Sequence, residues 1–382
     1  MIIYSIFYFV FFFLFKKKIP KFFFILYGII FLSSLLFDTG FSGLNEYALK
    51  PINMIVFVLS IIIMLLPLNS IEFNDIFNVN LSIKKIKQIA FVFGFCGSLS
   101  AIYFTPFALT VSLNNADSIR NSLGSGNSVL PNTIFNYIFT AFSQLYIFYL
   151  YFYFVALKKN IGNVYKFLLL IASLSYIVNS VVFAARDGYV IYVISLITFL
   201  LYTGNNQIFK IKNFLLLVPF GYLILSITIS RFGDIESKSF LVGTLGYIGQ
   251  QPYVFNEALT KNIEFYGADL RFPLFSSNET PPLRSNTFER MFGTWLLDLY
   301  MVKGYLSLFL GLLIFNLLPK YIKIIRRRTS LGSNLLKIIY LQYLIQGLFY
   351  FRSGNLPGNI ILVFIVVTSL ILFFITQKNK TF

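Results

Sequence analysis

The side chains best suited to chemistry in this sequence are its arginines. Of 10 Arg and 21 Lys, seven Arg but only four Lys fall in one alternate set of the segments that separate the apolar runs, counted with the adjoining ends of those runs. Arg offers a planar, permanently charged fork that binds phosphate or carboxylate in a bidentate manner, which Lys does not supply. This division predicts a site for an anionic, membrane-embedded ligand. The seven residues are Arg120, Arg186, Arg231, Arg271, Arg284, Arg290 and Arg352.

Carboxylates near these arginines are candidates for orienting or deprotonating a hydroxyl group. Asp187 directly follows Arg186, and Glu289 directly precedes Arg290. Glu257 is a further candidate. At each position an ion pair is the alternative interpretation, and contact with lipid headgroups is the alternative for the arginines.

Asp298 and Lys303 fall inside a predicted apolar helix. Charged side chains are costly within a membrane, so such positions are functional candidates by default. Their spacing of five residues does not place them on one helical face, so we do not expect them to pair with each other. Ion pairs with other helices remain the alternative.

Absent residue types exclude several kinds of site. The chain has no His and a single Cys, Cys96, which excludes His-based metal ligation, Ser-His and Cys-His nucleophile pairs, and an intramolecular disulfide. The glycines Gly243, Gly246 and Gly249 do not open a helix after a strand, so they are not a dinucleotide-binding motif. We predict neither a cofactor nor a metal.

The elements that position these residues must lie mostly in lipid. The chain is 57% hydrophobic and 12% charged, with a mean hydropathy of +0.77, whereas ordinary soluble domains are about 25% charged. The net charge of +17 does not indicate a nucleic-acid partner, because most of the chain has no water-exposed face on which basic residues could cluster.

Apolar runs of nearly twenty residues predict membrane-spanning helices. The sequence holds about eleven of them, and we expect a single integral membrane domain over residues 1–382, an all-α polytopic membrane protein. The predicted spans are 2–15, 22–37, 51–68, 88–112, 133–157, 165–184, 188–203, 213–230, 295–318, 335–351 and 356–376.

Charge predicts the orientation of these spans. One alternate set of connecting segments holds 20 basic and two acidic residues, and the other set, counted with its helix ends, holds 11 basic and 12 acidic residues. Because Lys and Arg are enriched in cytoplasmic segments, we expect the first set inside, the N-terminus outside and the C-terminus inside. Lys16–Lys18 and Arg326–Arg328 are then topology anchors.

The longest connecting segment, residues 231–294, is expected to be an external, periplasmic loop. Loops of this length usually carry structure or function of their own. Gly243–Gly249 followed by Pro252, Tyr253 and Phe255 predicts a short amphipathic or re-entrant piece, and later prolines predict an extended second half.

This layout resembles the bacterial O-antigen and capsule repeat-unit polymerases, the Wzy-type membrane glycosyltransferases. Short sequence motifs are similar as well: Ala185–Gly188 at the start of an apolar span, Tyr247–Gln250 with Phe255 and Asn256 in the loop, and Asp298–Gly304 before a Leu/Phe-rich span. The related O-antigen ligases use an external His, which this sequence lacks.

The resemblance implies a function in polysaccharide biosynthesis at the bacterial inner membrane. Undecaprenyl-pyrophosphate-linked glycans would be both donor and acceptor on the external side, and the product would be lipopolysaccharide O-antigen or capsule. Arg186, Arg290, Asp187 and Glu289 are then catalytic candidates. Arg231, Arg271, Arg284 and Arg352 would hold pyrophosphate or glycan, while Tyr247 and Tyr253 would stack on sugars, with membrane-edge anchoring as their alternative. A chain-length regulator membrane protein is a further implied partner.

Other functions fit the same layout less well. A lipid-linked oligosaccharide flippase should carry charges within its spans and short loops on both sides. Another lipid-dependent envelope transferase, or an accessory membrane protein, is also an alternative.

Overall fold

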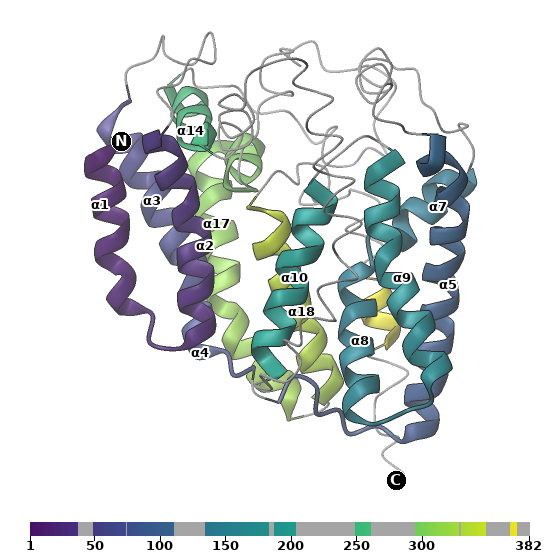
Figure 1. Cartoon of the computed structure of the whole chain (residues 1–382). Coiled ribbons are helices and arrows are strands. Elements are labelled where there is room, and N and C mark those ends of the chain that lie inside the picture. Colours follow the sequence, from purple (N-terminus) through teal and green to yellow (C-terminus); the bar gives the residue numbers. More distant parts are fainter. Residues whose placement is uncertain are drawn as a thin grey trace. The chain divides into compact units, whose positions relative to one another are not determined.

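The computed structural model describes residues 1–36, 49–73, 75–110, 134–182, 187–203, 249–260, 295–327, 330–348 and 367–372. Within these residues every regular element is a helix (Figure 1). Five described helices are long and apolar enough to cross a membrane, and a bent pair makes six. Within the described residues, the prediction of an all-helical fold with helices able to cross a membrane is therefore confirmed, but these helices do not support the predicted count of about eleven spans.

The chain divides into two compact units, each assembled from separate segments. Unit 1 comprises Met1–Glu72, Ser237–Arg328 and Tyr343–Leu370, and unit 2 comprises Phe73–Glu236, Thr329–Gln342 and Ile371–Phe382. Each unit thus combines early and late parts of the sequence.

Unit 1 begins with an apolar hairpin of α1 (Ile2–Val10), the 3-10 turn η1 (Phe11–Leu14) and α2 (Lys18–Leu36). The ring of Tyr8 stacks on Phe24 with centroids 4.3 Å apart, and its hydroxyl donates to the Phe24 carbonyl at 2.7 Å. Tyr27 likewise donates to the carbonyl of Leu344 at 2.7 Å. Each buried tyrosine therefore satisfies its polar end with backbone.

The next span of unit 1 is α3 (Pro51–Leu65) with the short α4 (Pro67–Ser70). Pro51 stands at the start of α3 and Pro67 at the start of α4, where a missing N–H costs no helical hydrogen bond. Together they form the candidate span Pro51–Ser70.

Helix α17 (Trp295–Arg326) of unit 1 corrects a prediction, because the expected uninterrupted span over 295–318 is broken at Lys303 and Gly304. Gly304 has φ 61° and ψ −144°, a conformation that glycine adopts far more easily than other residues. Lys303 is exposed at this break and does not lie inside a continuous apolar helix. The candidate span is Lys303–Arg326, so the backbone of Asp298 lies in the helical piece before it.

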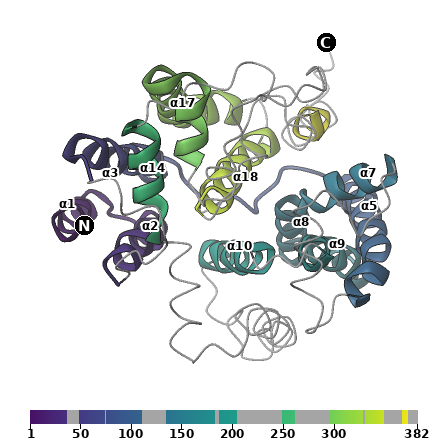
Figure 2. The same ribbon diagram turned by 90° about the horizontal axis from the view of Figure 1, so that it is seen from above.

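Unit 2 contains α5 (Ile83–Thr110), α7 (Ile134–Ser143), α8 (Tyr146–Lys158), α9 (Asn163–Val182) and α10 (Asp187–Thr203), with the first part of α18 (Ser330–Gln346). Figure 2 shows α5, α8 and α9 side by side. The predicted span over 133–157 corresponds to a bent pair of helices, because α7 and α8 meet at an angle of 47°.

Small residues allow α5 and α9 to approach closely. A Cβ atom at Gly94 would lie 2.9 Å from the Cβ of Leu168, and one at Gly97 would overlap the Cβ of Ala172, both on α9. Lipid provides no hydrophobic force to bring helices together, so close van der Waals packing at small residues supports such pairs. Substitution of either glycine would force the helices apart.

The segment between α4 and α5 enters unit 2 at Phe73. The carbonyl of Ile76 accepts hydrogen bonds from the Tyr151 hydroxyl at 3.0 Å and from the Asn334 amide at 2.7 Å. Because Ile76, Tyr151 and Asn334 are all buried, these bonds hold an irregular backbone against α8 and α18.

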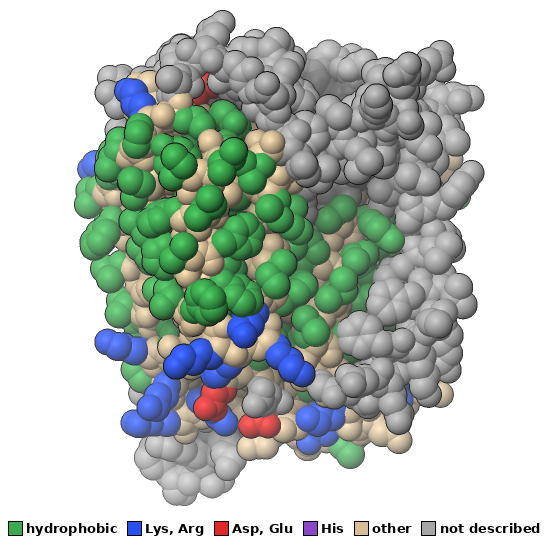
Figure 3. Space-filling model, turned by 60° about the vertical axis from the view of Figure 1, so that its left-hand side comes forward, with side chains coloured by type: hydrophobic (Ala, Val, Ile, Leu, Met, Phe, Trp, Pro, Cys, Tyr) green, Lys and Arg blue, Asp and Glu red, His purple; other side chains and the backbone are tan. Residues whose placement is uncertain are grey.

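Apolar side chains cover much of the face drawn in Figure 3, and Lys and Arg side chains gather toward its lower edge. Large apolar residues are exposed on several helices, as at Phe13 (84%) on η1 and Ile314 on α17. Soluble proteins rarely expose such continuous apolar surface. These faces are therefore suited to contact lipid.

Candidate functional site

The candidate site is built on α14 (Gln251–Thr260), a helix in the segment that the sequence predicts as an external loop. Eight of its ten residues are buried, which does not fit the amphipathic form of the predicted amphipathic or re-entrant piece. Its neighbours within unit 1 are α2 and α3, and Figure 2 shows it beside both. The helix buries three polar residues, Gln251, Asn256 and Glu257, and Gln250 directly before it is buried as well. Buried polar side chains require polar partners.

The entry to α14 is held against α2. The Ser34 hydroxyl donates to the Gly249 carbonyl at 2.5 Å. A Cβ atom at Gly249 would lie 2.8 Å from the carbonyl carbon of Ser33. Only glycine permits this approach of two backbones without displacement.

Two asparagines join α14 to the start of α3. The Asn53 amide donates to the Asn256 side-chain oxygen at 3.1 Å, to the Asn256 carbonyl at 3.2 Å and to the Thr260 hydroxyl at 3.1 Å. The same Asn256 oxygen accepts the backbone N–H of Lys50 at 2.9 Å. Asn256 thus completes the N-terminus of a helix 206 residues away, where Lys50 makes no side-chain cap.

Glu257 follows Asn256 and is the buried carboxylate of this cluster, with a relative exposure of 3%. Asp and Glu side chains are seldom fully buried, so a buried carboxylate on a helix between predicted spans is a functional candidate. On the opposite end of α14, the Gln251 amide donates to the Leu348 carbonyl at 2.7 Å. Polar contacts thus fix the helix on both sides of Glu257.

Aromatic rings surround the same helix. Phe255 lies 5.0 Å from Phe57 of α3 and 6.1 Å from Tyr300 of α17, measured between ring centroids. Tyr300 lies 5.4 Å from Tyr305 across the break in α17. The part of α17 that precedes the break therefore lies against α14. Tyr253 is half-buried on α14.

The structure describes only two of the ten residues that the sequence predicts for the site. Tyr253 lies on α14, and Asp187 is the first residue of α10, described by its backbone alone. The other eight lie outside the described residues, and the proposed arginine cluster is untested. They are Arg186, Arg231, Tyr247, Arg271, Arg284, Glu289, Arg290 and Arg352.

Sequence reasoning missed Asn53, Gln251 and Asn256 as parts of this site. Asn53 interrupts an otherwise apolar run, and a polar residue within a predicted span is a signal that could have singled it out. Nothing in the sequence indicates that its partner is Asn256.

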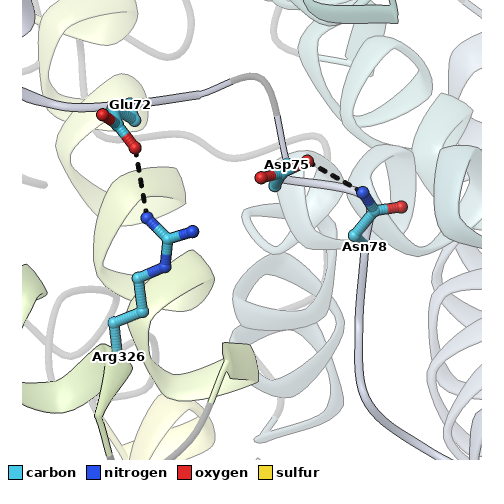
Figure 4. A network of polar contacts seen from close by, with 4 residues as sticks. All are labelled: Glu72, Asp75, Asn78 and Arg326. Atoms are coloured by element: carbon cyan, nitrogen blue, oxygen red, sulfur yellow. Dashed lines mark hydrogen bonds and ion pairs between the residues drawn. The ribbon is translucent and has the colours of Figure 1, made fainter.

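At the Lys- and Arg-rich end of unit 1, Arg326 pairs with Glu72 at 3.2 Å (Figure 4). Both side chains are exposed, so the pair contributes at most about 1 kcal/mol. In unit 2 the Asn78 amide donates to Asp75 at 2.9 Å within one turn. These contacts are typical of surface polar groups, and neither indicates a ligand site.

Among the described residues no group of three or more Cys, Asp or Glu side chains could hold a metal ion. Comparison with known proteins finds no matching family model, no similar curated protein and no similar solved structure.

Proposed function

We propose that this chain is a membrane glycosyltransferase that polymerises lipid-linked oligosaccharide repeat units into O-antigen or capsule. The observation that carries the proposal is α14, a helix between spans that buries Glu257 beside Asn256. Such a helix provides fixed polar groups in a dry setting, which glycosyl transfer requires. The seven arginines of the predicted external side supply cations for the pyrophosphate groups of the substrates.

The proposed topology has about eleven spans in the bacterial inner membrane, with the N-terminus outside and the reaction on the periplasmic side. The positive-inside distribution of Lys and Arg supports this orientation. The donor and acceptor are undecaprenyl-pyrophosphate-linked glycans, whose lipid tails keep both at the membrane surface.

Transfer breaks the bond between the anomeric carbon and the pyrophosphate oxygen and forms a bond from that carbon to the acceptor hydroxyl oxygen. The bonding electrons leave with the lipid pyrophosphate, and the hydroxyl proton passes to a carboxylate. Arg186 and Arg290 are proposed to neutralise the leaving pyrophosphate, with Arg231, Arg271, Arg284 and Arg352 holding the substrates. Asp187, Glu289 and Glu257 are the candidate bases.

A complementation experiment tests the proposal. A strain that lacks the chain receives wild-type protein or single variants, and the surface glycan is resolved by length. Arg186→Lys and Arg290→Lys keep the charge but lose the bidentate fork, so the ladder should shorten or disappear. Glu257→Gln keeps the shape of the side chain and should reduce polymerisation about 100-fold or more if Glu257 is the base.

The control is Glu72→Gln, which removes an exposed carboxylate at the opposite, Lys-rich end of unit 1 and should leave the ladder unchanged while all variants are expressed equally. Loss of the chain should leave single repeat units on the surface lipid. Repeat units trapped inside the cell would instead identify a flippase, and unchanged chain lengths in both arginine variants would refute the arginine cluster.

A further inference from the structure

A groove of about 470 Å³ lies in unit 2 where the first turns of α5 meet the start of α9. It combines two cations with aromatic and apolar side chains. Its lining is Ile83, Lys84, Lys87, Gln88, Phe91 and Tyr165. The Lys87 ammonium group lies 5.9 Å from the centre of the Tyr165 ring, so the aromatic ring holds one cation at the edge of the groove.

The groove lies in a region of unbalanced positive charge. Six lysines, Lys84, Lys85, Lys87, Lys158, Lys159 and Lys166, occupy the ends of α5, α8 and α9. The sequence has no acidic residue from 76 to 116 or from 118 to 186. Membrane orientation alone would explain the number of lysines. It would not explain why two of these lysines, Lys84 and Lys87, line the same groove.

An apolar stripe on α5 continues from the groove along the helix. Phe91, Phe95, Leu99 and Ile102 recur at spacings of three or four residues, which places them on one helical face. All four are exposed, Phe91 at 53%, and the rings of Phe91 and Phe95 stack 6.0 Å apart. The site therefore has a cationic end and a long apolar end.

We propose that this groove binds an anionic phospholipid. Lys84 and Lys87 would take its phosphate, Gln88 and the Tyr165 hydroxyl would donate hydrogen bonds to the headgroup, and the acyl chains would lie along Phe91, Phe95 and Leu99. Basic pockets between helices at the cytoplasmic face of a membrane are suited to such headgroups, and a free phosphate would leave the apolar stripe unused. This inference does not depend on the proposed glycosyltransferase function.

The test measures lipid retention by the full chain purified in mild detergent. Phosphatidylglycerol and phosphatidylcholine are titrated separately, and bound lipid is counted by native mass spectrometry. We expect wild-type protein to retain phosphatidylglycerol in preference to phosphatidylcholine. The double variant Lys84→Gln/Lys87→Gln should bind phosphatidylglycerol at least about tenfold more weakly, since each basic residue near an anionic headgroup contributes to affinity.

The matched control is Lys158→Gln/Lys159→Gln, which removes the same charge from the end of α8 without altering the groove lining. This control and the charge-conserving variant Lys84→Arg/Lys87→Arg should retain phosphatidylglycerol. Equal losses in both Gln variants, or no preference over phosphatidylcholine, would overturn the proposal. Displacement of the lipid by millimolar inorganic phosphate would overturn it too, because it would identify a free-anion site.

Discussion

Asn256 illustrates how one amide can join two helices. Its side-chain oxygen accepts the Lys50 N–H at 2.9 Å and the Asn53 amide at 3.1 Å, and the side chains of both asparagines are buried. If a buried acceptor is removed, its donors stay buried without a hydrogen-bond partner, which destabilises the folded state. Asn256, the residue before Glu257 in the sequence, therefore helps to hold the candidate site in place.

We therefore predict that Asn256→Ala lowers the free energy of unfolding by about 1–3 kcal/mol. Thermal unfolding of the purified protein in detergent would measure the change as a lower Tm. Asn78→Ala is the control, because it removes one exposed hydrogen bond within a turn and should change stability by less than about 0.5 kcal/mol. Equal Tm values for Asn256→Ala and wild-type protein would contradict this role.

At the scale of elements, α14 depends on a close approach of backbones. Gly249 lies against Ser33 and Ser34 of α2. A Cβ atom added at Gly249 would lie within 2.9 Å of three of their backbone atoms. The neighbouring atoms belong to a helix and cannot rotate away as a side chain could. The position of α14, and of Glu257 on it, is thus set by contact with α2.

Gly249→Ala should displace α14 from α2 and destabilise the protein by about 1–3 kcal/mol. Gly162→Ala is a matched control, because Gly162 also precedes a helix but its added Cβ atom would lie no closer than 3.7 Å to the Tyr165 ring. Limited proteolysis and thermal unfolding should therefore separate the two variants. Indistinguishable behaviour would mean that the contact with α2 does not hold α14.

The break in α17 is an element-scale feature that could not be predicted from the sequence. The run over 295–318 is apolar enough to predict one span, yet the chain breaks at Lys303 and Gly304. Lys303 donates its backbone N–H to the Ser307 hydroxyl at 2.8 Å, so a side chain replaces a helical carbonyl there. Hydropathy averages over such a window and cannot detect a break made by one glycine and one hydroxyl.

At the scale of the whole molecule, the proposed orientation depends on the distribution of basic residues. The single Cys96 makes this orientation testable, since Cys96→Ala leaves a chain without cysteine. In that background we predict that Asn45→Cys and Asn262→Cys react with a membrane-impermeant maleimide in intact cells. Asn205→Cys and Thr329→Cys should react only after the membrane is permeabilised. The reverse pattern would require the opposite orientation and place the 231–294 segment inside.

The sequence by itself determined that this protein is helical and belongs in a membrane. Lipid offers no hydrogen-bonding partners, so each apolar run must satisfy its own backbone as a helix, and that requirement is local. Only the tertiary structure decided that Asn53 meets Asn256 across 203 residues, that α14 is buried on nearly all sides, and that two lysines line a groove with Tyr165. Those features arise from contacts between distant segments, and no local pattern of residues specifies which segments meet.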